Sequence, residues 1–430
     1  MGWENKMIVH KSIITEEENE ICVSAKVDTK NHNIKFPDVL WFKFPKGYKE
    51  YVTDRSDGFA AALLPLAMVL GEDIEIKGTV SPRLAFGMRE YQRITSVWWP
   101  DLLRSVHVTF ENLKSLEEKK ATGKVGCAFS GGVDSFYTLW SHLPRNEAIE
   151  KYRISHCLMI KRFNLLEDKI NFDTIQKIYE PMMKRLDLQL LVCDSNIVIE
   201  FIGPIEKILL EKPLGELFTP IHGTTITAFV LMLGRLFSDF YIGSAYKFTY
   251  SQPDGSNPLL VHLLSTETTE MIGDGSHLTR VEKTATLSNW PETYLKLRVC
   301  FKATADEKKD MILNCCKCEK CLRTMTSLYL LHKLPQYASF PSPLTGKNIR
   351  KVYYSRGGKY HFAQEIIDYA IRTGRKSIAL NIRVAVFLNR MTNPIYHLNH
   401  RLIKQSKTYS TLMDLIKKVL SIRLTSKDNR

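Results

Sequence analysis

Lys124-Val-Gly-Cys-Ala-Phe-Ser-Gly-Gly-Val-Asp-Ser135 is the stretch around which the rest of the sequence can be interpreted. Its first half, residues 125–129, is a short apolar run of the kind buried in a parallel sheet. Residues 130–135 are a turn of small residues, and residues 136–143 have the pattern of an apolar-faced helix. A strand, a turn and a helix in this order aim backbone N–H groups at an anion. The two glycines allow positive φ and close approach, so the stretch predicts a phosphate-binding loop.

The polar side chains of this turn add to the expected site. Ser130 and Ser135 offer hydroxyl donors, and Asp134 is placed to hold Mg²⁺ or to cap the helix. The Gly-Lys-Ser/Thr ending of a Walker A loop is missing. An ordinary structural turn is the competing interpretation, because many strand–helix connections carry a glycine pair.

The size and composition are those of an ordinary globular protein. The chain has 430 residues, of which 44% are hydrophobic and 25% charged, so two or three domains are expected. The longest apolar run, residues 226–240, is interrupted by Gly234, Arg235 and Asp239 and is expected to be a core helix rather than a membrane span. The N-terminus lacks the pattern of a secretory signal, so a cytoplasmic location is expected.

The positive charge is concentrated at the C-terminus. The net charge is +14, and residues 341–430 contain 18 Lys and Arg against 4 Asp and Glu, which leaves the first 340 residues neutral. The sequence therefore predicts a basic, mostly helical C-terminal segment over 341–430. Such a segment suits nucleic acid or an acidic partner. A solvated tail without a ligand is the alternative.

The first 115 residues predict a small N-terminal α+β domain. Strands are expected over residues 21–27, 39–44, 73–78 and 106–110, and helices over 58–70 and from Ser81-Pro82 towards Thr95. Residues 111–123 are polar and indicate a linker or an exposed helix. The sequence of this domain contains no group of residues with the spacing of metal ligands, and it does not indicate what the domain does.

The segment 116–340 predicts a second domain in which strands and helices alternate. Further strands are expected over residues 156–160, 189–193 and 240–244, with helices over 172–188 and 220–237. This alternation predicts an α/β fold with a doubly wound parallel sheet. Ligands of such sheets lie beyond the carboxyl ends of the strands. Ser130, the residues after Ile160, Asp194 and Gly243-Ser244 are expected to gather there.

Cysteines form a second constellation. Cys300, Cys315, Cys318 and Cys321 have the spacing of a metal site, with Cys316 as a duplicated neighbour, over a predicted knuckle at 300–321. Four thiolates suit a closed, structural Zn²⁺ site. Three of them would alternatively hold an iron–sulfur cluster. Buried core cysteines do not fit, because Lys317, Glu319 and Lys320 interleave the cysteines.

Taken together, these motifs resemble those of a known enzyme superfamily. Residues 130–135 resemble the PP-loop of the ATP pyrophosphatase superfamily, which cleaves ATP between the α- and β-phosphates. The loop, the later four-cysteine knuckle followed by Leu322–Thr324, and the glycine-ended stretch Tyr241–Ser244 resemble the 7-cyano-7-deazaguanine synthase family over about residues 124–329. The resemblance implies a HUP-like PP-loop ATPase fold with ATP, Mg²⁺ and a structural Zn²⁺. It also implies a ligase that adenylates a carboxylate and lets ammonia displace AMP, giving an amide and then a nitrile.

The chain departs from that family at two places. His222-Gly223 stands where the family has Arg-Asn, and residues 274–280 replace its Tyr-Pro-Asp-Cys-Arg element. We therefore expect a ligase similar to the synthase that acts on a different carboxylate.

The site residues predicted on this basis fall into three groups. Arg280 and Lys283 have i, i+3 spacing and would share a helix face to clamp pyrophosphate or the acyl phosphate, although a pair of surface charges is an equal alternative. His222, at a helix N-terminus, would bind phosphate or act in proton transfer, unless it is an ordinary polar residue. The complete sets are: catalytic Asp134, Arg280 and Lys283; ATP-binding Ser130, Gly131, Gly132, Val133, Asp134, Ser135, Ile160, His222, Gly243 and Ser244; metal Cys300, Cys315, Cys318 and Cys321.

Two other functions remain open at this point. A PP-loop tRNA thiolation enzyme would use the basic tail for RNA and a cysteine persulfide or an iron–sulfur cluster for sulfur transfer. A binding module would keep the nucleotide pocket without turnover. The expected partners are a small carboxylate substrate, an ammonia donor and a second copy of the chain in a homo-oligomer.

Overall fold

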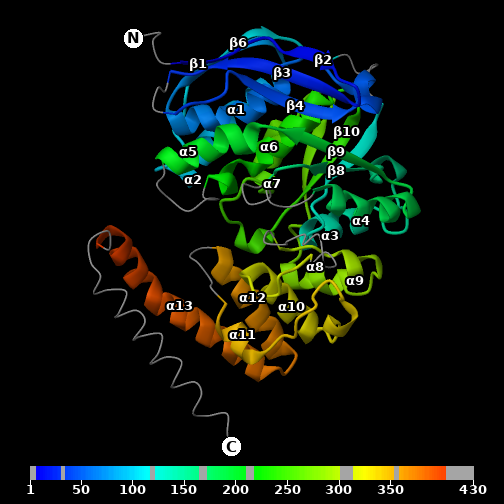
Figure 1. Cartoon of the computed structure of the whole chain (residues 1–430), viewed down its shortest axis with the longest axis vertical. Coiled ribbons are helices and arrows are strands. Elements are labelled where there is room, and N and C mark those ends of the chain that lie inside the picture. Colours follow the sequence, from blue (N-terminus) through cyan, green and yellow to red (C-terminus); the bar gives the residue numbers. More distant parts are fainter. Residues whose placement is uncertain are drawn as a thin grey trace, which may run out of the picture. The chain divides into compact units, whose positions relative to one another are not determined.

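The computed structural model describes residues 6–30, 34–116, 122–163, 172–209, 217–300, 313–352 and 358–402. The chain divides into two compact units, residues 1–344 and residues 345–430. The first unit contains an α/β sheet of eleven strands, most of them paired in parallel, with the helices described below (Figure 1).

The strands are short and mostly buried on at least one face. They are β1 (Lys6–Val9), β2 (Ile13–Glu16), β3 (Glu20–Asp28), β4 (Val39–Pro45), β5 (Asp73–Val80), β6 (Val108–Leu113), β7 (Lys124–Ala128), β8 (His156–Ile160), β9 (Gln189–Ser195), β10 (Phe237–Gly243) and β11 (Glu270–Asp274).

The α-helices connect these strands and form the C-terminal unit. They are α1 (Asp57–Leu70), α2 (Pro82–Trp98), α3 (Val133–Ser141), α4 (Phe172–Arg185), α5 (Gly203–Leu209), α6 (Phe218–Met232), α7 (Pro258–Val261), α8 (Arg280–Leu287), α9 (Glu292–Lys296), α10 (Glu319–Leu330), α11 (Gly346–Arg350), α12 (Gly358–Arg372) and α13 (Lys376–Leu402).

One half of the sheet is doubly wound. Its strand order is β11-β10-β7-β8-β9, and every neighbouring pair within it is parallel. The chain moves outward from β7 through β8 to β9 and then crosses back to β10 on the other side of β7. The order therefore reverses between β7 and β10, which is the place where open α/β sheets bind ligands.

The other half of the sheet is built by the first 113 residues. Its order is β4-β3-β1-β5-β6, with β2 paired to β3. The halves join where β4 pairs antiparallel with β9, with Phe42 opposite Ser195 and Lys43 opposite Asp194. The segments 1–115 and 116–340 that the sequence divides into two domains thus share one sheet. The compact unit 345–430 begins close to the predicted start of the C-terminal segment at 341.

A single apolar cluster fills the space under this sheet. Helices α1 and α6 pack side by side beneath β1, β3 and β4 (Figure 1). Phe229 of α6 meets Phe42 of β4 edge-on, with 5.0 Å between ring centroids, and both rings are fully buried. Ile226, Phe237 and Phe240 belong to the same cluster. The apolar run 226–240 is therefore a core segment, but it forms the end of α6 and the start of β10 rather than one helix.

The linker expected over residues 111–123 is only partly a linker. Residues 111–113 continue β6, which pairs in parallel with β5. The side chains at positions 108 and 110 of β6 are half-buried, and those at 109 and 111–113 are exposed. The exposed end of the strand includes Glu111 and Asn112, so its composition is similar to that of a loop.

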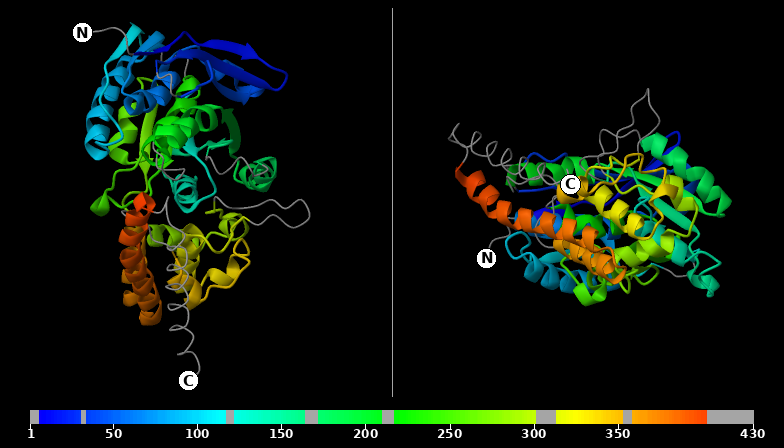
Figure 2. Two further views of the ribbon diagram at one scale, coloured as in Figure 1. Left: turned by 60° about the vertical axis from the view of Figure 1, so that its left-hand side comes forward. Right: turned by 90° about the horizontal axis from the view of Figure 1, so that it is seen from below.

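The second unit is described from Thr345 to Val352 and from Gly358 to Leu402. Its helices α12 and α13 lie side by side (Figure 2). Asn389 of α13 donates to the carbonyl of Val352 at 2.9 Å, and Arg350 of α11 donates to Asn381 at 2.7 Å. Residues 403–430 of the predicted basic segment lie outside the described residues.

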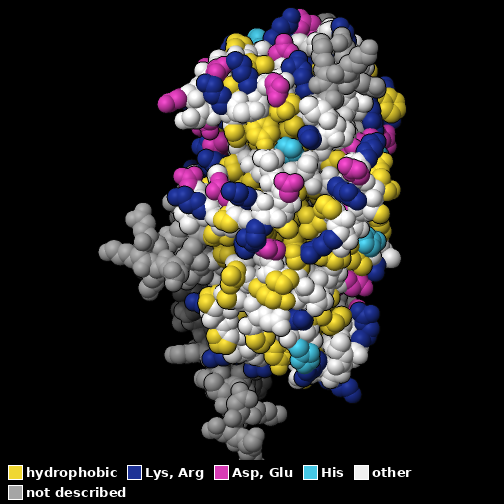
Figure 3. All heavy atoms as spheres, turned by 90° about the vertical axis from the view of Figure 1, so that its right-hand side faces the viewer, with side chains coloured by type: hydrophobic (Ala, Val, Ile, Leu, Met, Phe, Trp, Pro, Cys, Tyr) yellow, Lys and Arg dark blue, Asp and Glu magenta, His cyan; other side chains and the backbone are white. Residues whose placement is uncertain are grey.

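The surface is mixed in charge on the face that Figure 3 displays, where Lys and Arg lie among Asp and Glu. In the described part of the chain, no helix combines the length and the apolar character that a membrane crossing requires.

The crossing of α1 and α6 gives a test of this packing. A Cβ atom added at Gly58 would lie 2.6 Å from the carbonyl oxygen of Ala228 on α6. We expect Gly58→Ala to lower the free energy of unfolding by about 1–3 kcal/mol, because the two helices must move apart. Gly47→Ala is the control, since a Cβ there meets no atom within 4 Å. Urea unfolding followed by circular dichroism measures both, and equal stability of the two variants would contradict the packing.

Candidate functional site

The glycine-containing turn follows β7 at the point where the strand order reverses. Strand β7 ends at Ala128, the turn spans residues 129–132, and α3 begins at Val133 with Gly132 as its N-cap. The first N–H groups of a helix have no partner within the helix. In this structure the backbone N–H groups of Ser130 and Gly132 donate to the hydroxyls of Ser135 and Ser130, at 3.3 Å each. Ser130 and Ser135 lie across the loop from each other, with 3.3 Å between their hydroxyl oxygens.

The loop is held in position by residues far along the chain. Gly131 has a φ of 76°, and a Cβ atom there would lie 1.8 Å from the hydroxyl of Tyr179, so a larger residue does not fit. The Tyr179 hydroxyl donates to the carbonyl of Lys296 at 2.9 Å. The backbone N–H of Arg298 donates to the carbonyl of Gly131 at 2.7 Å. The loop conformation therefore depends on the segment that leads into the cysteine knuckle.

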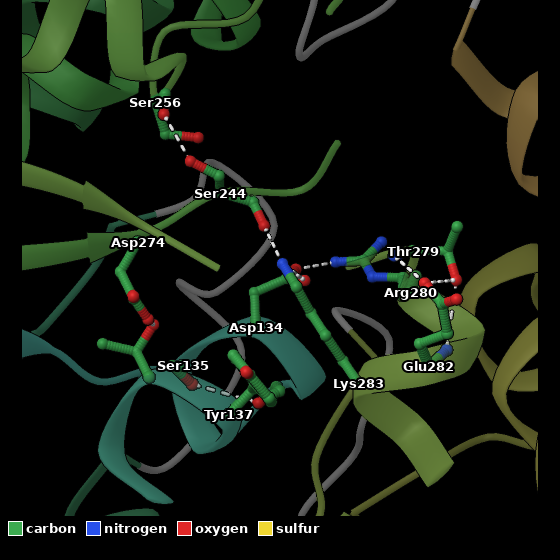
Figure 4. A network of polar contacts seen from close by, with 12 residues as sticks. Asp134, Ser135, Tyr137, Ser244, Ser256, Asp274, Thr279, Arg280, Glu282 and Lys283 are labelled. Carbon is green, nitrogen blue, oxygen red and sulfur yellow. Dashed lines mark hydrogen bonds and ion pairs between the residues drawn. The ribbon is translucent and has the colours of Figure 1, made fainter. Parts of the chain in front are cut away.

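Asp134 of α3 forms ion pairs with two cations of α8 (Figure 4). Arg280 hydrogen-bonds to one carboxylate oxygen, and the Lys283 ammonium lies 3.5 Å from the other. Lys283 is fully buried and also donates to the backbone carbonyl of Ser244 after β10. Helix α8 is fixed by a capping box between Thr279 and Glu282. The i, i+3 spacing thus places both cations on one helix face at the loop, as the sequence predicts.

Charge and burial oppose each other at this contact. Burial raises the pKa of Asp134, but the positive charges of Arg280 and Lys283 outweigh it and leave the pKa below its ordinary value. Burial lowers the pKa of Lys283, and the charge of Asp134 partly restores it. Asp134 does not cap α3, because no side chain caps that helix and its carboxylate faces α8 instead. Of the two roles expected for Asp134, capping of α3 is therefore wrong, and binding of Mg²⁺ stays a prediction.

Three other predicted residues lie at the ends of neighbouring strands. Ile160 ends β8 opposite Cys193 of β9. Gly243 ends β10 beside the backbone of Asp134, and Ser244 follows it as the acceptor for Lys283. These positions lie at the carboxyl edge of the parallel strands, where the sequence places them.

His222 has protein partners in this structure. It lies near the start of α6, where its Nδ1 is 2.9 Å from the carbonyl of Thr219 and its Nε2 is 3.5 Å from Asp254. Its ring stacks on Phe218. These contacts show that His222 links α6 to the loop at residue 254. Its predicted role in ATP binding stays a hypothesis.

A small hollow opens beside Ser244, with a free volume of about 10 Å³, which is room for about one water molecule. Its lining combines serine hydroxyls with Tyr246, Phe248 and Asp254, and more of it is apolar than polar. In the described part of the chain, the buried hydroxyl of Ser276 in this lining has no hydrogen-bond partner. The hollow therefore lies next to the residue that accepts from Lys283 but holds no more than a small group.

The four predicted cysteines come together in space. Their sulfur atoms lie within 4.8 Å of one another. The distances are 3.8 Å for Cys300–Cys318 and for Cys315–Cys321, and 3.4 Å for Cys318–Cys321. A tetrahedral Zn²⁺ with bonds of about 2.3 Å requires sulfurs about 3.8 Å apart. The group thus fits one tetrahedral metal ion such as zinc.

Metals of this kind bind thiolates, so the group must lose protons when it takes up an ion. Without a metal, the hydrogen bonds among the thiols lower the pKa of Cys300 and raise the pKa of Cys318 and of Cys321. Cys316 stands apart from the group, with φ of 55° and its thiol 3.5 Å from the carbonyl of Asn314.

The sequence interpretation missed two cations at this site. Lys320 and Arg323 lie in the first turn of α10, and α10 packs against α8. Desolvation and the nearby charges of Arg280 and Arg323 lower the pKa of Lys320 to about 7. Their i, i+3 spacing repeats that of Arg280 and Lys283, and this signal would have found them. Asp274, at the end of β11, was also missed and accepts from Thr138 of α3 at 2.7 Å.

Comparison of the chain with family models, curated proteins and solved structures found no match.

The cysteine group generates a direct test. We expect the purified chain to carry about one Zn²⁺, and Cys318→Ser to lose it, because three thiolates no longer close the tetrahedron. Cys316→Ser is the matched control, since its sulfur lies outside the group, and it should retain the metal. Elemental analysis of both variants after gel filtration measures the content. Equal zinc in the two variants would rule out the assigned ligand set.

Proposed function

We propose that the chain is an ATP-dependent ligase that adenylates a carboxylate and then converts the acyl adenylate into an amide. One observation carries the proposal: Arg280 and Lys283 converge on Asp134, in the first turn of the helix that follows the glycine-containing loop at the reversal point of the parallel sheet. A loop of this shape suits phosphate, and cations beside it suit a leaving group that gains negative charge. ATP is the substrate that needs both.

The proposed reaction has two steps. A carboxylate oxygen attacks the α-phosphorus of ATP, and the bond from that phosphorus to the bridging oxygen breaks, which releases pyrophosphate. Ammonia then attacks the acyl carbon, AMP leaves with the electron pair of the C–O bond, and one proton passes to solvent. Mg²⁺, when bound, neutralises part of the phosphate charge.

The residues of the chain have separate tasks in this scheme. Backbone N–H groups of the loop and the hydroxyls of Ser130 and Ser135 bind phosphate oxygens in place of the contacts that they make with one another in this structure. Arg280 and Lys283 stabilise the departing pyrophosphate, and Asp134 keeps both cations aligned before ATP arrives.

The cysteines support the ligase over a sulfur-transfer enzyme. The group's sulfurs are too close for each thiolate to bind a different iron of a cluster, whereas they fit one zinc ion. Cys127, Cys157 and Cys193 lie buried within β7, β8 and β9. Burial raises the pKa of Cys157 and of Cys193, which disfavours the thiolate that a persulfide carrier requires.

The proposal predicts ATP–pyrophosphate exchange that depends on α8. With a panel of small carboxylates and without ammonia, the wild-type chain should incorporate labelled pyrophosphate into ATP. Arg280→Ala should reduce the exchange rate by roughly 100-fold or more, because a donor to the developing charge is lost. Arg93→Ala, which removes an exposed cation paired with Glu90 on α2, should leave the rate unchanged.

Thermal unfolding of the variants checks that each is folded. ATP bound without exchange, AMP or pyrophosphate under any condition would favour a binding module instead of the ligase.

A further inference from the structure

The first turn of α10 belongs to two sites at once. Cys318 is the N-cap of the helix and Cys321 lies in its first turn, so two of the four sulfurs fix where α10 begins. Lys320 and Arg323 alternate with these cysteines along the same turn. The position of both cations is therefore set by the cysteine group.

These cations lie next to the cations of α8. Helices α8 and α10 pack against each other (Figure 1). Helix α8 also contacts α3, where Arg280 and Lys283 pair with Asp134. Arg323 is only 5% exposed and is oriented by an ion pair of 3.2 Å with Glu319. Two pairs of basic side chains thus lie on two helices that contact each other, and one of these helices is joined to Asp134.

A second connection joins the cysteine group to the loop from the other side. Arg298, two residues before Cys300, donates its backbone N–H to Gly131. The fully buried Asn314, next to Cys315, accepts from the N–H of Val299 at 2.9 Å and donates to the carbonyl of Leu297 at 2.8 Å. The chain entering the cysteine group is therefore tied to the loop backbone, while the chain leaving it carries Lys320 and Arg323.

We propose that Lys320 and Arg323 bind the β- and γ-phosphates of the nucleotide together with Arg280, and that the metal held by the four cysteines sets the affinity of this polyphosphate site. The inference rests on the proposed function, which supplies the nucleotide. The metal ion has no contact with phosphate in this scheme. Its part is to hold the first turn of α10 and the segment at Arg298 against the loop.

Coupling of this kind is reciprocal. If the metal-bound knuckle raises the affinity for polyphosphate, then bound polyphosphate must raise the affinity for metal by the same factor. A structural zinc site that is independent of the loop gives no such effect. The two possibilities therefore differ in a binding measurement that requires no catalysis.

The first experiment compares two lysines of the same knuckle. In the zinc-loaded full-length chain, Lys320→Gln should weaken binding of α,β-methylene ATP and of pyrophosphate by roughly 10- to 100-fold, because a charge-assisted hydrogen bond is lost. Lys317→Gln makes the same chemical change three residues earlier at an exposed position and should bind both as the wild type does. Calorimetry measures the affinities, and zinc content confirms that each variant retains its metal.

The second experiment uses the wild-type chain alone. Zinc occupancy is measured at equilibrium across a series of chelator concentrations, with and without saturating α,β-methylene ATP. We expect the analogue to raise the chelator concentration needed for half-removal by at least about fivefold.

The outcomes separate the two proposals. A wild-type chain that binds the analogue, with equal affinity in both lysine variants and an unchanged chelator midpoint, overturns the coupling and leaves the ligase standing. A wild-type chain that binds neither the analogue nor pyrophosphate overturns both.

Discussion

The ion pairs of Asp134 with Arg280 and Lys283 are the contact on which the site depends. They join α3, which follows the central strand, to α8, which follows the edge strand β11. Buried charges are stable only when paired, and Lys283 has no exposed surface. The same contact brings the loop, the end of β10 at Ser244 and the helix beside the cysteine group into one neighbourhood.

The sequence specifies the parallel half of the sheet well, and for a physical reason. Strands such as residues 156–160 are buried on both faces, so their apolar runs stand out, and the structure places β8 over the same residues. The four cysteines were also found, because few other roles explain such spacing, and their sulfurs do come together. The i, i+3 rule located Arg280 and Lys283 on one helix face because helical geometry follows directly from spacing.

The parts that local patterns miss depend on contacts between distant segments. The pairing of Phe42 with Ser195 joins residues more than a hundred positions apart, and the sequence of neither strand predicts which strand it pairs with. Likewise, the sequence left Asp134 either to hold Mg²⁺ or to cap its own helix, whereas in the structure its carboxylate pairs with α8. Lys320 and Arg323 lie on either side of Cys321, and only the packing of α10 on α8, which local spacing does not reveal, relates them to Arg280 and Lys283.

The antiparallel seam between β4 and β9 has a consequence for how the chain folds. In a fragment that starts after β6, the peptide groups on one edge of β9 would lack the hydrogen bonds that β4 supplies. Helix α6 would also lack the contact with α1. Phe229, whose ring rests on Phe42 and Phe44, would then face water. The parallel half of the sheet is thus not autonomous: the N-terminal strands must be made and docked before the carboxyl edge of these strands acquires its final shape.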